Sequence, residues 1–109
     1  MNIAHVSEQS GLSARMIRHY EAIGLVPQPE RSEGNYREYD ETDLERLKVV
    51  AAARTAGFGM DDIRQILALW SGAGDQDRTA TAASWMDVVA ARQRALDTVR
   101  QALSKLDFG

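Results

Sequence analysis

The 109-residue chain contains no cysteine. That absence excludes disulfides, thiolate metal ligands, thiol redox sensing and cysteine nucleophiles among these residues. The two histidines, His5 and His19, are too few to form a metal site by themselves. We therefore expect neither a metal nor a cofactor.

The chain also lacks an apolar stretch long enough to span a membrane, and it shows no signal-peptide pattern. These two absences lead us to expect a cytoplasmic protein. The sequence contains no nucleophile–base pair, no glycine-rich phosphate loop and no cluster of metal-ligand residues, so it predicts no enzyme. A chain of 109 residues forms one domain, or a small domain followed by an appended helix.

A basic total charge is missing as well, because the formal net charge is −3. This balance argues against a protein that coats nucleic acid without sequence preference. It does not exclude a specific DNA binder, which needs a few well-placed cations. Residues 1–39 carry four arginines against five glutamates, so only the placement of the arginines can favour DNA binding.

The most informative stretch is 13–20, which predicts a short helix with Ser13 as its N-cap. Apolar residues at helical spacing give it one buried stripe: Met16, Ile17 and Tyr20. The basic residues are left on the other side: Arg15, Arg18 and His19. Such a helix fits a major groove, where arginine matches guanine edges or phosphates. The alternative is an ordinary amphipathic surface helix whose arginines are solvated.

A second helix is predicted just before this stretch, over residues 2–9, with Asn2 as its cap. Ser7, Gly11 and Ile17 then follow the spacing of a helix-turn-helix: a small residue at the crossing, glycine in the turn and a β-branched residue on the second helix. Taken alone, this pattern has many false positives.

After Gly24 ends the second helix, Pro27 and Pro29 predict an extended connection. Residues 31–39 then predict a two-stranded hairpin whose turn is Gly34-Asn35. As a wing, this hairpin carries three candidate contacts: Arg31, Tyr36 and Arg37. The alternative is a plain surface hairpin whose tyrosines pack on the second helix.

Two further helices and a break follow. The first is predicted to begin at the N-cap Asp40, which acidic first-turn residues follow, and to run to about Ala56. Gly57 is its predicted C-cap and Phe58 an apolar anchor after it. A second capped start is predicted at Met60, with an apolar side running to Trp70. We therefore divide the chain into a DNA-binding head with connector helices (1–70), a hinge loop (71–77) and a final helix (78–107).

The final helix contains neither proline nor glycine, and its apolar residues recur in alternating steps of three and four. Arg92 occupies the one position of this series that is not apolar. The spacing is typical of a coiled-coil seam. The seam residues are Trp85, Val89, Leu96, Val99, Leu103 and Leu106. Because this small chain offers nothing to bury the whole stripe, we predict a homodimer. The alternative is that the helix folds back on the two helices before it.

Several short motifs stand at separations typical of one family: Ile17-Arg18-His19-Tyr20-Glu21, Gly24-Leu25-Val26, Asn35-Tyr36-Arg37-Glu38-Tyr39 and Ala56-Gly57-Phe58. In this combination the chain resembles the MerR family of bacterial transcription regulators. The resemblance runs from Met1 to about Trp70 and continues loosely along the final helix. Within the family, the opening residues and Arg31-Ser32-Glu33 are most similar to the copper-responsive branch.

The resemblance implies a mostly α fold: a winged helix-turn-helix head with a small β-hairpin wing, a helical connector and a long antiparallel coiled-coil dimerisation helix. It implies a dimer on a pseudo-palindromic promoter spacer, which distorts the DNA to control RNA polymerase on the same promoter. Matched position by position, the implied DNA contacts are Arg18, Tyr20, Arg31, Tyr36 and Arg37. Three further positions complete the candidate set: Arg15 and His19 on the exposed side of the helix, and Asn35 in the wing.

The chain departs from its metal-sensing relatives, which place cysteines in a loop after the dimer helix. Two interpretations stay open: a DNA-binding and dimerisation fragment of a longer sensor, or a short member that senses nothing through thiolates. A third alternative is a protein-interaction module that uses the long helix and has lost DNA binding.

Overall fold

The computed structural model describes residues 1–70 and 77–107. The chain divides into two compact units, Met1–Ser71 and Gly72–Gly109. We call the described part of the first unit the head and the long helix of the second the tail helix, and describe each by itself. The predicted hinge loop, apart from Asp77, lies outside the described residues.

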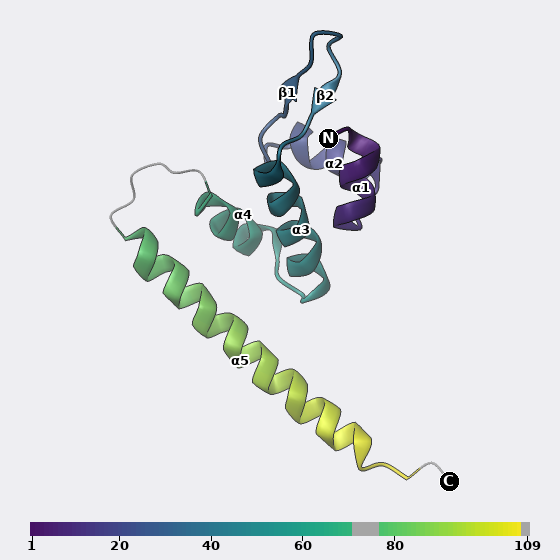
Figure 1. Ribbon diagram of the computed structural model, residues 1–109. Helices are drawn as coiled ribbons and strands as arrows, with labels where there is room; N and C mark the ends of the chain where they lie inside the picture. The colour runs from purple at the N-terminus through teal and green to yellow at the C-terminus, as the bar shows by residue number, and fades with distance from the viewer. Residues whose placement is uncertain (71–76, 108–109) are drawn as a thin grey trace. The chain divides into compact units, whose positions relative to one another are not determined.

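The described fold is mostly helical, as predicted (Figure 1). The head contains α1 (Ile3–Ser10), α2 (Ala14–Ala22), β1 (Glu30–Arg31), β2 (Arg37–Glu38), α3 (Glu41–Thr55) and α4 (Met60–Ala68). The tail helix is α5 (Arg78–Ser104).

α1 and α2 form the predicted helix-turn-helix. The Asn2 side chain accepts from the His5 amide, and the Ser13 side chain accepts from the Met16 amide, so both caps are confirmed. Gly11, between the helices, has φ of 80°, a conformation that glycine adopts without steric cost. The turn is fixed further because the Ser7 hydroxyl donates to the Leu12 carbonyl at 2.6 Å.

The wing is a smaller hairpin than the sequence predicts, because each strand has only two residues. The antiparallel register places Glu30 opposite Glu38 and Arg31 opposite Arg37. The Ser32 amide donates to the Tyr36 carbonyl and the Asn35 amide donates to the Ser32 carbonyl. The connection is therefore a three-residue loop that ends in left-handed Asn35, with φ of 63°, and not a tight turn centred on Gly34-Asn35.

The core of the head lies where its four helices meet. α1 packs on α3 and on α2, and α3 packs on α4. Each helix contributes at least one fully buried side chain to the centre: Val6, Ile17, Leu47, Val50 and Ile63. Phe58 is half-buried against this cluster, as predicted for an anchor after α3.

The starts of α3 and α4 differ. At α3, Asp40 and Asp43 form a reciprocal capping box in which each side chain accepts from the other residue's backbone amide. At α4, the predicted capped start is wrong: Gly59 is the N-cap and no side chain caps the helix. Asp61 and Asp62 lie in the first turn of α4, where their charge favours the positive end of the helix dipole.

The tail helix has 27 residues, none of them buried. Most of the predicted seam residues are exposed: Val89, Leu96, Val99, Leu103 and Leu106; Trp85 is half-buried. The helix ends before Leu106, whose amide donates to the Leu103 carbonyl in the turn that follows. None of the helices in 1–70 or 77–107 has the length and apolar character needed to cross a membrane.

Candidate nucleic-acid interface

The outer face of α2 carries three exposed basic side chains: Arg15, Arg18 and His19. Their spacing of three and four residues places them on one side of the helix. Neither arginine makes a hydrogen bond or an ion pair with any residue that the structure describes. Within the described part of the chain, the donors of both guanidinium groups are thus unused, and they can serve an external partner.

The inner face of α2 is formed by Ile17, Tyr20 and Glu21, all buried. The Tyr20 hydroxyl accepts a hydrogen bond of 2.6 Å from Arg54 Nη1. The Arg54 guanidinium carbon also lies 5.9 Å from the centre of the Tyr20 ring, within the range of a cation–π interaction. Tyr20 thus lies on the inward side of α2, as its three-residue spacing from Ile17 requires, and not on the face of Arg15 and Arg18.

Arg54 is a basic residue that sequence reasoning did not place in the site. It comes from the last turn of α3 and lines a hollow of about 410 Å³ together with His19, Phe58 and Met60. The sequence contains a sign that Arg54 faces the core, because Arg54 continues the helical spacing of the buried residues Leu47 and Val50 along α3. A cation on that stripe has to reach a partner at the edge of the core, and here the partner is Tyr20.

The wing adds a second group of basic and polar side chains. Arg31 and Arg37 are directly opposite in the antiparallel register, so their side chains share one face of the hairpin. Arg31 Nη1 donates to the Asn35 carbonyl at 3.4 Å. Tyr36, with 75% of its surface exposed, extends from the strand end beside exposed Asn35.

A buried carboxylate joins α2 to the wing. Glu21 Oε1 accepts from Arg37 Nε at 3.0 Å, and Glu21 Oε2 accepts from the Tyr39 hydroxyl at 2.7 Å. Burial, followed by the hydrogen bond and the charge of Glu21, raises the pKa of the Tyr39 phenol, so Tyr39 stays protonated and remains a donor.

Sequence reasoning treated Glu21 only as part of a family motif. Its position, one helical turn after the buried Ile17, could have shown that this carboxylate faces inward and needs donors.

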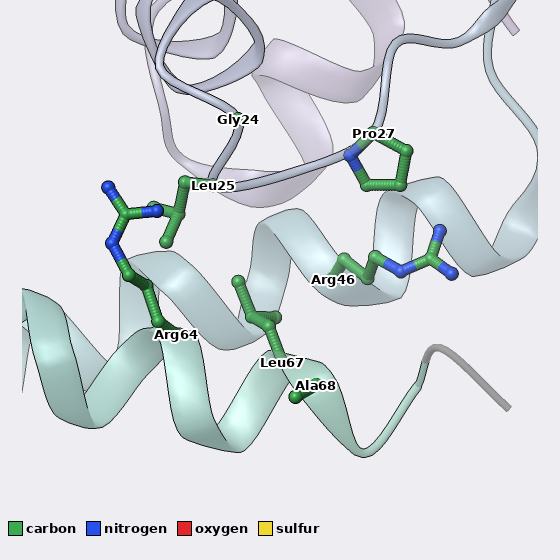
Figure 2. Close-up of a pocket in the computed structure, with 7 residues that line it drawn as sticks. All are labelled: Gly24, Leu25, Pro27, Arg46, Arg64, Leu67 and Ala68. Atoms are coloured by element: carbon green, nitrogen blue, oxygen red, sulfur yellow. The ribbon is translucent and has the colours of Figure 1, made fainter. Parts of the chain in front are cut away.

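A separate hollow of about 560 Å³ lies between the connection after α2, α3 and α4. Figure 2 shows Arg64 beside Leu25 at one end of it and Arg46 beside Pro27 at the other. Arg46 donates to Asp43 and to the Trp70 carbonyl, whereas Arg64 has no hydrogen bond or ion pair within the described part of the chain. Within that part, no group of three His, Cys, Asp or Glu side chains could hold a metal ion.

Taken together, the head presents unpaired arginines on a short exposed helix and a second basic group on an adjoining hairpin. Cations on these two elements can bind phosphates, and the helix face can also reach base edges. This arrangement supports binding of duplex nucleic acid more directly than any chemistry of bond making or breaking.

Comparison with known proteins gives two family matches that together cover most of the chain. Residues 1–70 match the family described as "MerR HTH family regulatory protein", and residues 44–106 match the one described as "MerR, DNA binding".

Among curated proteins, the chain is 38% identical over 106 residues to the HTH-type transcriptional regulator HmrR of Rhizobium leguminosarum bv. viciae, covering 97% of this chain and 78% of the relative. It is 46% identical over 70 residues to the "Heavy metal-dependent transcription regulator 2" of Rhizobium meliloti. That match covers 64% of this chain and 48% of the relative, so it spans about half of that protein's length.

Among solved structures, the chain is similar to HiNmlR, a MerR family regulator lacking the sensor domain, which was crystallised bound to promoter DNA. The TM-score is 0.78, with 95% of this chain and 78% of that chain covered. At 22% identity, this likeness shows the shared fold.

Proposed function

This chain belongs to the MerR family of helix-turn-helix regulatory proteins, DNA-binding transcription regulators and not enzymes, and from that premise we propose that it binds a pseudo-palindromic promoter spacer as a homodimer. Bound there, it distorts the duplex and so controls RNA polymerase on the same promoter. One observation carries the DNA-binding part of the proposal: on the exposed face of α2, Arg15 and Arg18 have no hydrogen-bond or ion-pair partner among the described residues.

The size of α2 suits the major groove. With its side chains an α-helix is about 10–12 Å across, and the groove is about 12 Å wide. Arg15, Arg18 and His19 face outward and can reach base edges or phosphates. The wing residues Arg31 and Arg37 contact phosphates, which fix the position of the protein and carry little sequence information.

Tyr20 acts indirectly in this scheme. Its side chain is buried, and its hydroxyl holds Arg54 at the edge of the hollow beside His19. In this proposal Arg54, and not Tyr20, is therefore the residue that contacts DNA directly. Asn35 and Tyr36, exposed at the loop end of the wing, remain candidates for contacts with the sugar–phosphate backbone.

Dimerisation through the tail helix is supported by its exposed apolar stripe. Two copies of the helix, packed antiparallel, would bury Leu96, Val99 and Leu103 in one seam. A helix of 27 residues is about 40 Å long. Half-sites one turn of DNA apart are separated by roughly 34–36 Å, so a pair of such helices is long enough to join two heads on successive major grooves.

Distortion of the spacer needs free energy, which the contacts of both heads supply. Smooth bending of a site of this size costs on the order of 1–6 kcal/mol. Two heads with several arginine contacts each can offset that cost. A single head has half of the contacts, so in this scheme the control of RNA polymerase depends on the dimer.

The test starts from selection of duplexes from a randomised library by the purified chain, because the operator is unknown. We expect enrichment of a pseudo-palindrome with half-sites about one helical turn apart. Light scattering of the complex should give two chains per duplex. Log affinity should fall linearly with log salt concentration.

Two results would overturn the proposal. One is a selected pool that binds no better than random duplex. The other is a mass of one chain at concentrations well above the binding constant, which would favour the protein-interaction alternative for the tail helix.

A further inference from the structure

We propose that Glu21 is a positioning residue, which holds the wing side chain Arg37 in the orientation in which Arg37 binds a DNA phosphate. The inference rests on the DNA-binding function proposed above. It assigns to Glu21 a role that acts through Arg37, because the Glu21 side chain is only 1% exposed and cannot itself meet the DNA.

The geometry ties α2 to the wing at two points. Glu21 lies in the last turn of α2, while Arg37 and Tyr39 stand 16 and 18 residues further along the chain. Each oxygen of the Glu21 carboxylate takes one of these two donors, at 3.0 and 2.7 Å. A single carboxylate thus links α2 to the wing residue Arg37 and to Tyr39, which follows β2.

The bond to Glu21 uses only one of the five donors of Arg37. The Nε–H group points inward to Glu21, and neither Nη atom has a hydrogen-bond partner among the described residues. Since the guanidinium is planar and rigid, fixing Nε also fixes the direction of both Nη atoms. The Arg37 side chain is 27% exposed, so these Nη donors are presented at the surface.

The register of the wing explains why a fixed Arg37 needs a counter-charge. Arg31 lies directly opposite Arg37, and like charges in that relation repel each other. The buried Glu21 carboxylate, which is bonded to Arg37, offsets the repulsion between the two arginines. The two guanidinium groups can then remain on one face of the hairpin, where a phosphate can meet both.

The position of Glu21 is not explained by the stability of α2. A carboxylate in the last turn of a helix faces the negative end of the helix dipole, and its burial costs further free energy. Arg37 and Tyr39 compensate these costs only because they reach Glu21 from the wing. The contacts of Glu21 therefore stabilise the junction between α2 and the wing, and not α2 itself.

The experiment is a double-mutant cycle on the affinity of the full chain for the selected duplex. Arg37→Ala should weaken binding about tenfold and reduce the salt slope by about one. Glu21→Ala should reproduce most of that loss and the same change in slope. In the Arg37→Ala background, Glu21→Ala should change affinity by less than about twofold, since a positioning residue has nothing left to position. The matched control, Glu8→Ala, removes an exposed carboxylate from α1 and should change affinity by less than about twofold.

Two outcomes overturn the positioning role. Tighter binding by Glu21→Ala would mean that Glu21 withholds Arg37 from DNA. Equal losses from Glu21→Ala with and without Arg37 would mean that Glu21 only stabilises the fold. If Glu21→Ala does not fold by circular dichroism, Tyr39→Phe replaces it in the cycle. This variant removes one hydroxyl and should weaken binding only when Arg37 is present.

A measurement on the free protein, without DNA, tests the role of Glu21 independently of the proposed function. In the free protein, the Arg37 Nε–H resonance should exchange slowly with solvent, and Glu21→Gln should preserve part of that protection because an amide oxygen still accepts. An Arg37 resonance that Glu21→Ala leaves unchanged would overturn the inference, whether or not a duplex is selected. Failure of the wild-type chain to select any duplex would overturn the proposed function instead.

Discussion

The head buries its apolar side chains, whereas the tail helix leaves most of its apolar side chains exposed. In the head, Val6, Ile17 and Val50 are fully buried, and every helix contributes to the same core. In the tail helix no residue is buried, and Leu96 and Leu103 are more than half exposed. The head therefore buries its apolar side chains within its own chain, whereas the tail helix leaves an apolar stripe exposed, which the second chain of the proposed dimer would cover.

The largest expected effect concerns that second chain. Leu96→Asp places a charge in the proposed seam, and a symmetric dimer carries the change twice. We expect the free energy of dimerisation to fall by about 4 kcal/mol or more, a thousandfold in the dissociation constant. Light scattering across a concentration series measures this change. Gln101→Glu, a new charge on the same helix off the seam, is the control and should leave the mass at two chains.

The comparison is sharpened by making one substitution in both regions. Leu47 is 2% exposed in the head and Leu96 is 65% exposed on the tail helix. Leu47→Ala should lower the free energy of unfolding by about 2–5 kcal/mol at any protein concentration, because it leaves a cavity. Leu96→Ala should destabilise the protein in a concentration-dependent way. Equal, concentration-independent losses in thermal or urea unfolding would contradict the distinction.

A third pair of variants asks which region meets the DNA. Arg18→Ala should weaken binding to the selected duplex by about 1–3 kcal/mol if Arg18 reads a base. Arg94→Ala makes the same change on the exposed surface of the tail helix and should have little effect. Fluorescence anisotropy at two salt concentrations measures both affinities. Similar losses from both variants would show that total charge, and not the face of α2, governs binding.

The smallest effect tests local stabilisation of the head. Asp40→Ala removes the side-chain cap of α3 and should lower the free energy of unfolding by about 1 kcal/mol. Glu41→Ala removes a charge from the same first turn without touching the cap, and it should cost only a few tenths of that. Chemical unfolding of the two variants side by side separates the hydrogen bond from the helix dipole.

Sequence reasoning succeeded where one residue type decides the local structure. Asn2, Ser13 and Asp40 were recognised as caps because their side chains accept from free amides of the first turn, and all three do so. Gly11 was recognised because a left-handed turn favours glycine. These predictions depend on neighbours within four residues, so tertiary packing did not alter them.

The candidate site was harder to predict because its contacts join distant parts of the chain. Tyr20 was assigned both to the buried stripe and to the DNA, and the structure places it on the stripe, bonded to Arg54 of α3. Glu21 and Arg37 are 16 residues apart, and no local pattern states that they meet. The length of the wing strands also escaped prediction, since it depends on where the left-handed Asn35 closes the loop.

The register of the wing has one more consequence, which concerns dissolved ions. Glu30 faces Glu38 and Arg31 faces Arg37, so both rungs of this short ladder join like charges. Glu38 and Arg37 each also have a counter-ion in the head, the Met1 ammonium at 2.9 Å and the Glu21 carboxylate at 3.0 Å. Added salt screens these attractions as well as the repulsion within each rung. Ionic strength therefore acts on the wing in two opposing directions, and in the proposed complex a DNA phosphate would add a further counter-charge to its basic rung.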